Sequence, residues 1–278
     1  MRLGGEIVSV DSRQLYRGLR VTSNAPTDED LRGIPAHLVG IVDPGTRINV
    51  ASFVAMARPV LDEIRGRGLT PVITAGTGLY LKALVDGLEL GEPPPPAPVR
   101  AALEAEALAD LPALVGRLRD LDPAAADVVD VDNPARVVRR MEMALARGAH
   151  GPGAPAASLV ATIKVGLAVD RQVLYRRIEA RADEMLSGGW RDEVEALIAA
   201  GIDPGAQAFT SIGLAELAAV ARGDMALADA RAVIVQRTRN YAKRQMTWFR
   251  ADPGVRWIDV TALPLSDIVD RVVASVSS

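Results

Sequence analysis

Short apolar runs recur along the chain, and each ends at polar residues or at a turn-forming dipeptide. The first run, Ile7–Val10, is rich in β-branched side chains and predicts a buried strand of a parallel sheet. Similar runs predict strands at 38–42, 71–74, 164–169 and 255–260. Each is short enough to be a strand rather than a helix.

Longer segments between these runs carry apolar residues at helical spacing. In 50–64 the apolar positions follow the i, i+3, i+4, i+7 rule, which predicts an amphipathic helix ending at Gly66 and Gly68. Other helices are predicted at 134–147, 171–187, 190–200, 212–222, 227–249 and 265–278. Strands that alternate with helices indicate an α/β fold with a mostly parallel sheet flanked by helices.

A proline run at 92–98 is the clearest break in composition. Proline fits neither a sheet nor a helix interior, so this run predicts a stiff connector into a different unit. Residues 99–130 then give short Ala/Leu-rich helical segments without strand signals. We therefore expect a small all-helical insertion at 91–130, and an α/β core made of 1–90 and 131–278.

Composition narrows the function by exclusion. With 278 residues, 49% hydrophobic and a net charge of -3, the chain has no global charge signature of nucleic-acid binding, so such binding would need local basic patches. The absence of cysteine and the presence of only two histidines exclude disulfides, thiolate catalysis and a His-rich metal centre. No apolar run reaches the ~18 residues of a membrane span, and no signal peptide is recognisable. These features predict a cytoplasmic protein without membrane contact.

Polar residues follow the first strand directly, as Asp11-Ser12-Arg13-Gln14. In open α/β sheets, ligands bind beyond the carboxyl ends of the strands. A carboxylate, a hydroxyl and an amide at this edge suit proton abstraction and polar recognition. The alternative is that Asp11 or Ser12 only caps the next segment.

Gly76-Thr77-Gly78 stands where the strand at 71–74 passes into a helix. Backbone N–H groups at such a helix N-terminus favour phosphate, and the Thr77 hydroxyl can donate to a phosphate oxygen. A tight turn without a ligand explains the same residues equally well.

Two helices are strongly basic. In the helix that starts at Pro134, Arg136, Arg139, Arg140 and Arg147 share one face without an acidic partner there, which favours a polyanion contact over a merely solvated surface. The segment 237–250 holds five basic residues and no acidic one. It combines cationic and aromatic positions, which suits a phosphate backbone and unstacked bases. A core helix with a solvated basic side is the alternative.

Together these stretches resemble the tRNA dimethylallyltransferases, also called tRNA isopentenyltransferases. Residues 11–18 are similar to their Asp-Ser-x-Gln-x-Tyr-Arg-Gly signature, and 75–80 to their Gly-Gly-Thr-Gly-Leu-Tyr. Asp122-Pro123 and 133–142 resemble their Asp-Pro…Arg-x-x-Arg-Ala-Leu-Glu helix. Residues 238–250 resemble their Thr-Arg-x-Tyr-Ala-Lys-Arg-Gln-x-Thr-Trp-Phe-Arg stretch. The order and spacing match over essentially the whole chain.

The resemblance implies a P-loop-NTPase-like core and a defined reaction. A dimethylallyl group would pass from its diphosphate to N6 of the adenosine next to the anticodon, with that base flipped into the protein. Asp11 would be the general base, while Ser12 and Gln14 would hold the adenine. Thr77 would lie near the bridging oxygen of the diphosphate. Its neighbours Gly76 and Gly78 would also bind the diphosphate.

The resemblance also implies partners. The helical insertion would grip the anticodon stem, and Mg²⁺ would accompany the diphosphate, with no metal ligand identified in the sequence. We expect the protein to act as a monomer. The residues expected to bind tRNA are Arg13, Arg136, Arg139, Arg239, Lys243, Arg244, Gln245 and Arg250.

The sequence departs from the family at its start. Family members open with a strand and a Gly-x-x-x-x-Gly-Lys-Ser/Thr loop, whereas this sequence begins with residues that resemble a helix end, Leu3-Gly4-Gly5. We expect a misplaced start or a fragment of a normal enzyme, with a gap or exposed surface in the sheet. A truncated, inactive tRNA-binding remnant is the alternative. A nucleotide kinase would need the loop and gives no reason for the basic helix.

Overall fold

The computed structural model describes residues 2–87, 97–150 and 161–277. The chain forms two compact units, one made of Met1–Asp86 with Ser158–Ser278 and the other of Gly87–Ala157. The second unit is larger than the insertion predicted at 91–130, because it also contains the helix at 134–150 that the sequence assigned to the core.

The strands of the first unit are all parallel, which confirms the predicted α/β fold. In the described residues they form two sheets instead of one. The first has the order β2-β1-β3, and the second consists of β4 and β5. The strand bounds are β1 Gly5–Val10, β2 Ala36–His37, β3 Thr70–Ala75, β4 Lys164–Ala168 and β5 Val255–Asp259.

The strand predicted at 38–42 is wrong. Leu38 and Gly40 both have φ of 63°, in the left-handed region, so the backbone turns instead of extending. The segment bonds to the loop that follows β1: the N–H of Gly40 donates to the carbonyl of Gln14, and Val42 forms a bridge with Tyr16. Pairing with β1 is confined to the two residues of β2.

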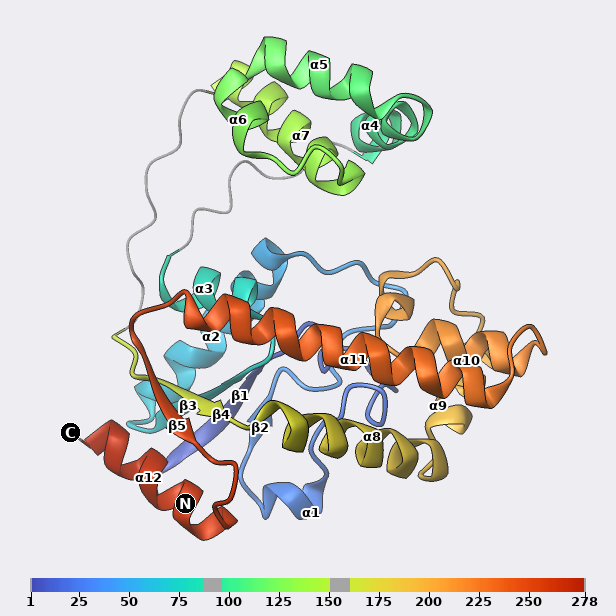
Figure 1. Ribbon diagram of the computed structural model, residues 1–278. Coiled ribbons are helices and arrows are strands. Elements are labelled where there is room, and N and C mark those ends of the chain that lie inside the picture. The colour runs from blue at the N-terminus through green and yellow to red at the C-terminus, as the bar shows by residue number, and fades with distance from the viewer. Residues whose placement is uncertain (1, 88–96, 151–160, 278) are drawn as a thin grey trace. The chain divides into compact units, whose positions relative to one another are not determined.

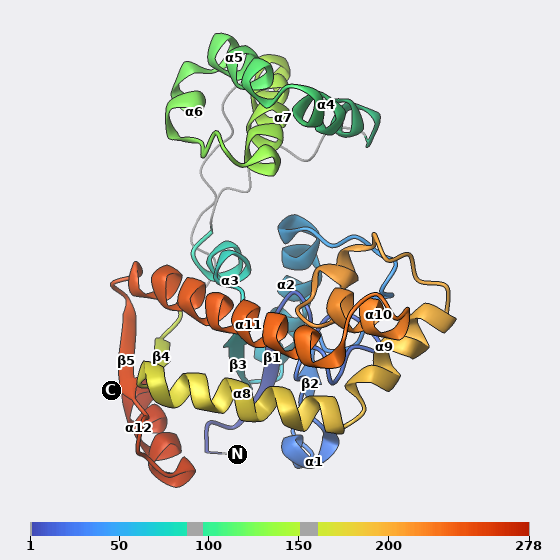
Figure 2. The ribbon, with the colours of Figure 1, turned by 45° about the vertical axis from the view of Figure 1, so that its right-hand side comes forward.

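The helices of the first unit surround the three-stranded sheet. Helix α2 buries Phe53, Leu61 and Ile64 and contacts β1 and β3. The longest helix, α11, lies beside α8 and reaches α3 (Figures 1 and 2). The helix bounds are α1 Asp28–Leu31, α2 Val50–Gly66, α3 Gly78–Val85, α8 Arg171–Ser187, α9 Trp190–Ala199, α10 Leu214–Ala221, α11 Leu227–Arg250 and α12 Leu265–Ser277. A short 3₁₀ helix, η1, spans Gln207–Thr210.

The second unit is helical in its described residues. Its helices are α4 Ala97–Ala109, α5 Leu111–Leu121, α6 Pro123–Val128 and α7 Pro134–His150. Val137, Val138 and Met141 of α7 are buried in one cluster with Leu103 of α4 and Leu114 of α5. Helix α7 therefore supplies one wall of this unit's own core, which is why it belongs there.

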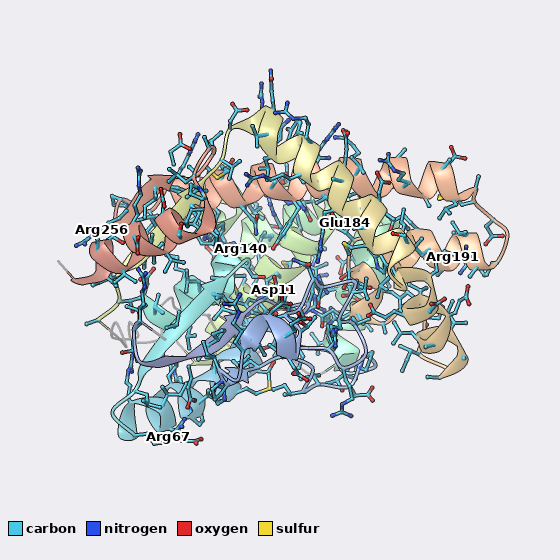
Figure 3. All side chains as sticks on the ribbon, turned by 90° about the horizontal axis from the view of Figure 1, so that it is seen from below. Asp11, Arg67, Arg140, Glu184, Arg191 and Arg256 are labelled. Atoms are coloured by element: carbon cyan, nitrogen blue, oxygen red, sulfur yellow. The ribbon has the colours of Figure 1, made fainter. Side chains whose placement is uncertain are left out.

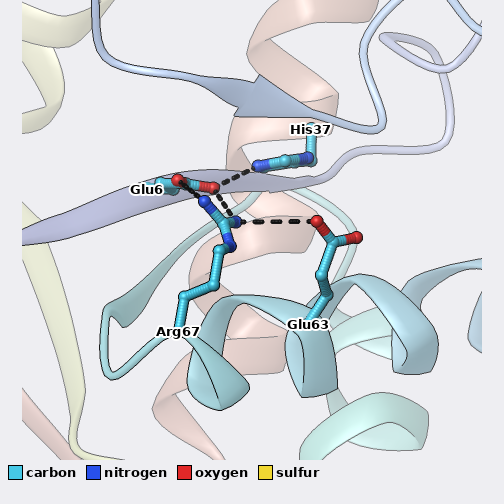
Figure 4. A network of polar contacts seen from close by, with 4 residues as sticks. All are labelled: Glu6, His37, Glu63 and Arg67. Atoms are coloured by element: carbon cyan, nitrogen blue, oxygen red, sulfur yellow. Dashed lines mark hydrogen bonds and ion pairs between the residues drawn. The ribbon is translucent and has the colours of Figure 1, made fainter.

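A polar network lies on the N-terminal half of β1 (Figure 4). Glu6 is only 5% exposed and accepts two hydrogen bonds from Arg67, at 2.6 and 2.7 Å. Its Oε2 also lies 2.7 Å from Nε2 of His37, so the carboxylate joins β1, β2 and the end of α2. The hydrogen bonds from Arg67, then that with His37, lower the pKa of Glu6 to about 2.

None of the helices in the described part of the chain is long and apolar enough to span a membrane.

Candidate active site

The carboxyl ends of β1 and β3 lie side by side, because Val10 pairs with Ala75. Asp11 and Gly76 therefore follow on neighbouring strands. The backbone N–H of Ser12 donates to Oγ1 of Thr77 at 3.3 Å, and that hydroxyl donates to Oγ of Ser12 at 3.5 Å. The structure thus brings together the first two stretches that the sequence singled out.

Asp11 makes the capping contacts that one of its two sequence interpretations predicted. Its Oδ1 accepts the backbone N–H groups of Arg13, at 2.7 Å, and Gln14, at 3.4 Å, which is the capping role. Its Oδ2 lies on the side of Gly76, and the residue lines a large cavity. Oδ1 thus fixes the loop while Oδ2 lies beside Gly76, and Figure 3 shows Asp11 near the middle of the first unit.

The two glycines of the β3–α3 turn are required by close packing. A Cβ at Gly76 would lie 2.7 Å from Oδ2 of Asp11, and one at Gly78 would lie 2.0 Å from the Trp248 ring. Thr77 occupies the N-cap position of α3 without making a side-chain cap bond. Its hydroxyl bonds Ser12 instead, so it links the turn to the loop that follows β1 and does not cap α3.

The cavity has a volume of about 950 Å³. On α11 its lining runs from Ile234 to Arg244, which corresponds to about 15 Å along the helix axis. This size accommodates a nucleotide-sized ligand. Other lining residues come from the β1 and β3 ends, from α8 and from the loops at 22–24 and 210–212: Asp11, Ser12, Thr77, Ile178, Met185, Thr22, Asn24, Ser211 and Ile212.

Positive charge dominates this lining. It includes five arginines, against only two carboxylates, Asp11 and Glu184. The arginines are Arg13, Arg177, Arg181, Arg237 and Arg244. A cavity lined mostly by one sign of charge concentrates ligands of the opposite sign, so this one suits an anionic ligand.

Hydrogen bonds orient four of these arginines, namely Arg13, Arg177, Arg181 and Arg237. Nη1 of Arg13 donates to the carbonyl of Gln207 at 3.0 Å. Arg237 pairs with Glu216, a buried carboxylate that also accepts the N–H of Gly213 at 3.1 Å. Such anchoring fixes the guanidinium groups before any ligand binds.

Gln14, predicted to hold the adenine, is not among the residues that line the cavity. Its Oε1 accepts from Oγ of Ser9 at 2.7 Å, and its Nε2 donates to the carbonyls of Ser23 and Asn24, both at 3.3 Å. The side chain thereby holds the 23–24 loop against β1.

The segment 237–250 holds no acidic residue, but two of its arginines pair with carboxylates of other helices. Arg237 pairs with Glu216 of α10, and Arg239 pairs with Glu179 of α8 and lies 4.8 Å from the centre of the Tyr175 ring. Both partners are remote in sequence, so a wheel of one helix could not find them. Lys243, Arg244 and Arg250 are exposed.

The prediction that the arginine face of α7 lacks an acidic partner is wrong. Nη1 of Arg136 lies 2.7 Å from Asp130, and Nη1 of Arg139 lies 3.0 Å from Glu142 on the same helix. Glu142 is buried and also contacts Arg100 at 3.2 Å. The side chain of Arg147 lies outside the described residues.

Sequence reasoning missed the contribution of α8 and of Ser211. Arg177 and Arg181 line the cavity, but the acidic residues of α8, Glu179, Asp183 and Glu184, make it resemble an ordinary solvated helix. Ser211 is 2% exposed, lines the cavity, and its Oγ has no hydrogen-bond partner among the described residues.

These features define an α/β fold with an arginine-lined cavity at the carboxyl edge of a parallel sheet, where enzymes of this class bind their ligands. Residues 14–252 match the family model described as IPP transferase. The chain belongs to the IPP transferase family.

The relatives agree with this assignment. A tRNA dimethylallyltransferase of Syntrophobacter fumaroxidans is 38% identical over 281 residues, covering 98% of this chain and 80% of the relative. One from a Nocardioides species is 40% identical over 282 residues, covering 100% and 89%. The crystal structure of the full-length tRNA isopentenylpyrophosphate transferase from Bacillus halodurans matches with a TM-score of 0.74 at 34% identity, covering 99% of this chain and 88% of that one. The resemblance drawn from the motifs is confirmed.

Proposed function

We propose that this protein transfers a dimethylallyl group from dimethylallyl diphosphate to N6 of the adenosine adjacent to the anticodon in tRNA. The family supports the reaction class. The observation that carries the proposal is the meeting of Asp11, Ser12 and Thr77 at the mouth of an arginine-lined cavity. A base, hydroxyl donors and positive charge are what an amine alkylation with a diphosphate leaving group requires.

Asp11 acts as the general base. The N6 lone pair forms a bond to the allylic carbon, whose bond to the diphosphate oxygen breaks and leaves its electron pair on the diphosphate. The N6 proton passes to Oδ2 of Asp11, while Oδ1 stays bonded to the N–H groups of Arg13 and Gln14. The cap bonds hold the carboxylate still during the transfer.

Thr77 acts on the leaving group. The N–H of Ser12 already donates to Oγ1 of Thr77, so the hydroxyl proton of Thr77 is the one available for donation. Its present bond to Ser12 is long, at 3.5 Å, and is readily exchanged for the bridging oxygen of the diphosphate. Gly76 and Gly78 keep the turn narrow enough for this approach, and Arg13 adds positive charge.

The residues present fit Mg²⁺ only as an ion that the diphosphate carries. The described residues contain no cluster of three or more metal-ligating side chains. Mg²⁺ commonly binds through substrate phosphates and water together with one or two carboxylates. Asp11 is assigned to the proton, so the ion would be held by the diphosphate and by water. When bound, the ion neutralises charge on the departing diphosphate.

The tRNA partner would be the anticodon stem-loop, bound by a monomer in the cytoplasm. Lys243, Arg244 and Arg250 are exposed on α11 and suit phosphate contacts. The second unit would grip the anticodon stem. On tRNA binding, Arg136 and Arg139 would leave their ion pairs with Asp130 and Glu142 and contact phosphates instead. Ser12, which follows Asp11 in the chain and lines the cavity, would bond the adenine, with Gln14 shaping the adjoining loop.

Transfer of label from radioactive dimethylallyl diphosphate to unmodified tRNA tests the proposal. Asp11→Asn retains an Oδ1 acceptor for the cap but cannot take a proton, so we expect a loss of about 10² or more in kcat. Asp43→Asn is the matched control, because Oδ1 of Asp43 likewise accepts a backbone N–H two residues on, from Gly45 at 2.8 Å. Undiminished transfer by Asp11→Asn would refute this assignment. Salt-sensitive tRNA binding without transfer by the unaltered chain would favour the inactive remnant.

A further inference from the structure

Three residues of α11 form a stripe that lies on the β3–α3 turn. The hydroxyl of Tyr241 donates to the carbonyl of Gly76 at 2.8 Å, and Nε2 of Gln245 donates to the same oxygen at 3.0 Å. Trp248 continues the stripe, with its ring against Gly78. The spacing i, i+4, i+7 puts all three side chains on one face of the helix.

The orientation of the Gly76 carbonyl affects the position of Thr77 in the site. It belongs to the peptide between Gly76 and Thr77, which directly follows Ala75, the residue paired with Val10 of β1. Glycine has no side chain to restrict this peptide, so its orientation depends on bonds from outside the turn. Two donors on one oxygen fill both of its lone pairs and fix the plane that directs Thr77 toward Ser12.

The same donors stand close to Asp11. A Cβ built on Gly76 would meet Oδ2 of Asp11 at 2.7 Å, the Tyr241 hydroxyl at 3.2 Å and Nε2 of Gln245 at 3.3 Å. These groups therefore crowd around one glycine. Any rotation of the Gly76 peptide would alter the position of Thr77 relative to the Asp11 carboxylate.

Tyr241 is suited to holding the turn and not to moving protons. Burial raises the pKa of Tyr241, and the negative charge of Asp11 raises it further. The phenol stays protonated at neutral pH and remains a donor to the carbonyl. It does not compete with Asp11 for the N6 proton.

We propose that Tyr241 and Gln245 are positioning residues that hold Thr77 and Asp11 in register through the carbonyl of Gly76. This role replaces the tRNA contact predicted for Gln245. It deepens the proposed function and rests on it for its kinetic consequence. The structural part, a turn held by two donors, stands apart from which substrate is used.

Kinetics of Tyr241→Phe and Gln245→Met test the kinetic part. Each variant removes one donor and keeps the packing, so we expect kcat to fall about tenfold while the KM for tRNA changes by less than about twofold. The double variant is expected to lose less than the product of the single losses, because both donors act on one oxygen. The matched control is Gln236→Met, an exposed glutamine of the same helix that bonds only Asn240, and it should retain the kcat of the unaltered protein. A KM for tRNA raised about tenfold at unchanged kcat in Gln245→Met would overturn the proposal and restore the tRNA contact.

Amide hydrogen exchange gives a readout independent of activity. Faster exchange in the peptides that cover residues 74–80 is expected in the double variant, with unchanged exchange in the peptides of α2. Unchanged exchange at 74–80 would overturn the proposal that Tyr241 and Gln245 hold the turn. If the unaltered protein transfers no label, the proposed function fails, and the exchange experiment still decides whether the turn is held. Thermal melting of each variant identifies loss of the fold.

Discussion

The backbone N–H of Ser12 donates to the side-chain hydroxyl of Thr77 at 3.3 Å, a hydrogen bond between segments 65 residues apart in the chain. A threonine at a helix N-cap usually bonds its own helix, and this one does not. The hydroxyl is therefore committed to the edge of the sheet where Asp11 stands. The bond ties the two sequence stretches into one site.

The Thr77 hydroxyl can be tested with two substitutions. Thr77→Val keeps the shape and removes the donor, so we expect kcat for label transfer to fall about 10–100-fold. Thr77→Ser restores the hydroxyl and should recover most of the rate. Thr74→Val, at an exposed threonine of the preceding strand β3, should leave kcat unaltered. Equal rates for Thr77→Val and Thr77→Ser would show that the hydroxyl has no part in the reaction.

Gly78 is expected to tolerate no side chain. The Cβ of Gly78→Ala would lie 2.0 Å from the Trp248 ring, so the ring or the turn must move. We expect the free energy of unfolding to drop by about 1–3 kcal/mol, measured by urea denaturation. Gly66→Ala is the control, since nothing lies within 4 Å of a Cβ at this helical glycine. If Gly78→Ala is as stable as Gly66→Ala, the ring is not fixed there.

Much of the site was predictable because its parts are local. Asp11 to Gln14 and Gly76 to Gly78 each follow a strand directly, and the rule that parallel strands carry ligands at their carboxyl ends places both stretches at one edge. The long helices were predictable from their apolar spacing. No long-range information was needed for any of these.

The remaining features depend on contacts that no local pattern encodes. The strand at 38–42 fails because Leu38 takes a positive φ, which an apolar run does not reveal. The boundary of the second unit moves because α7 packs on α4 and α5. Glu179 and Glu216 neutralise arginines of α11 from other helices, and only the folded chain brings them there.

Exposed and paired cations of α11 should behave differently toward tRNA. Lys243 and Arg250 are exposed, so Lys243→Met and Arg250→Met should each weaken tRNA binding and reduce the slope of log K against log salt by about 0.7–0.9. Arg239 pairs with Glu179, and Arg239→Met should mainly lower the melting temperature. Filter binding across a salt series gives the slopes. If the slope changes for Arg239→Met but not for Lys243→Met or Arg250→Met, the paired arginine and not the exposed cations contacts tRNA.

Glu6 is expected to make stability depend on acid pH. The pKa of its carboxyl lies at about 2 in the folded protein, against an ordinary value of 4.5, chiefly because Arg67 donates to it. A carboxyl with a lowered pKa contributes stability that is present above about pH 4.5 and is lost as the pH falls toward 2. Glu6→Gln cannot make this contribution. Its stability deficit relative to the unaltered protein should therefore shrink as the pH is lowered through this window.

Chemical denaturation at pH values from 6 down to 3 measures that deficit. Glu63→Gln is the matched control, because Glu63 lies 3.9 Å from the same Arg67 but its side chain is 71% exposed. An exposed pair of this kind contributes little, so this variant should track the unaltered protein at every pH. A Glu6→Gln deficit that stays constant from pH 6 to pH 3 would show that packing at this position, and not the charge of the carboxylate, stabilises the junction of β1, β2 and α2.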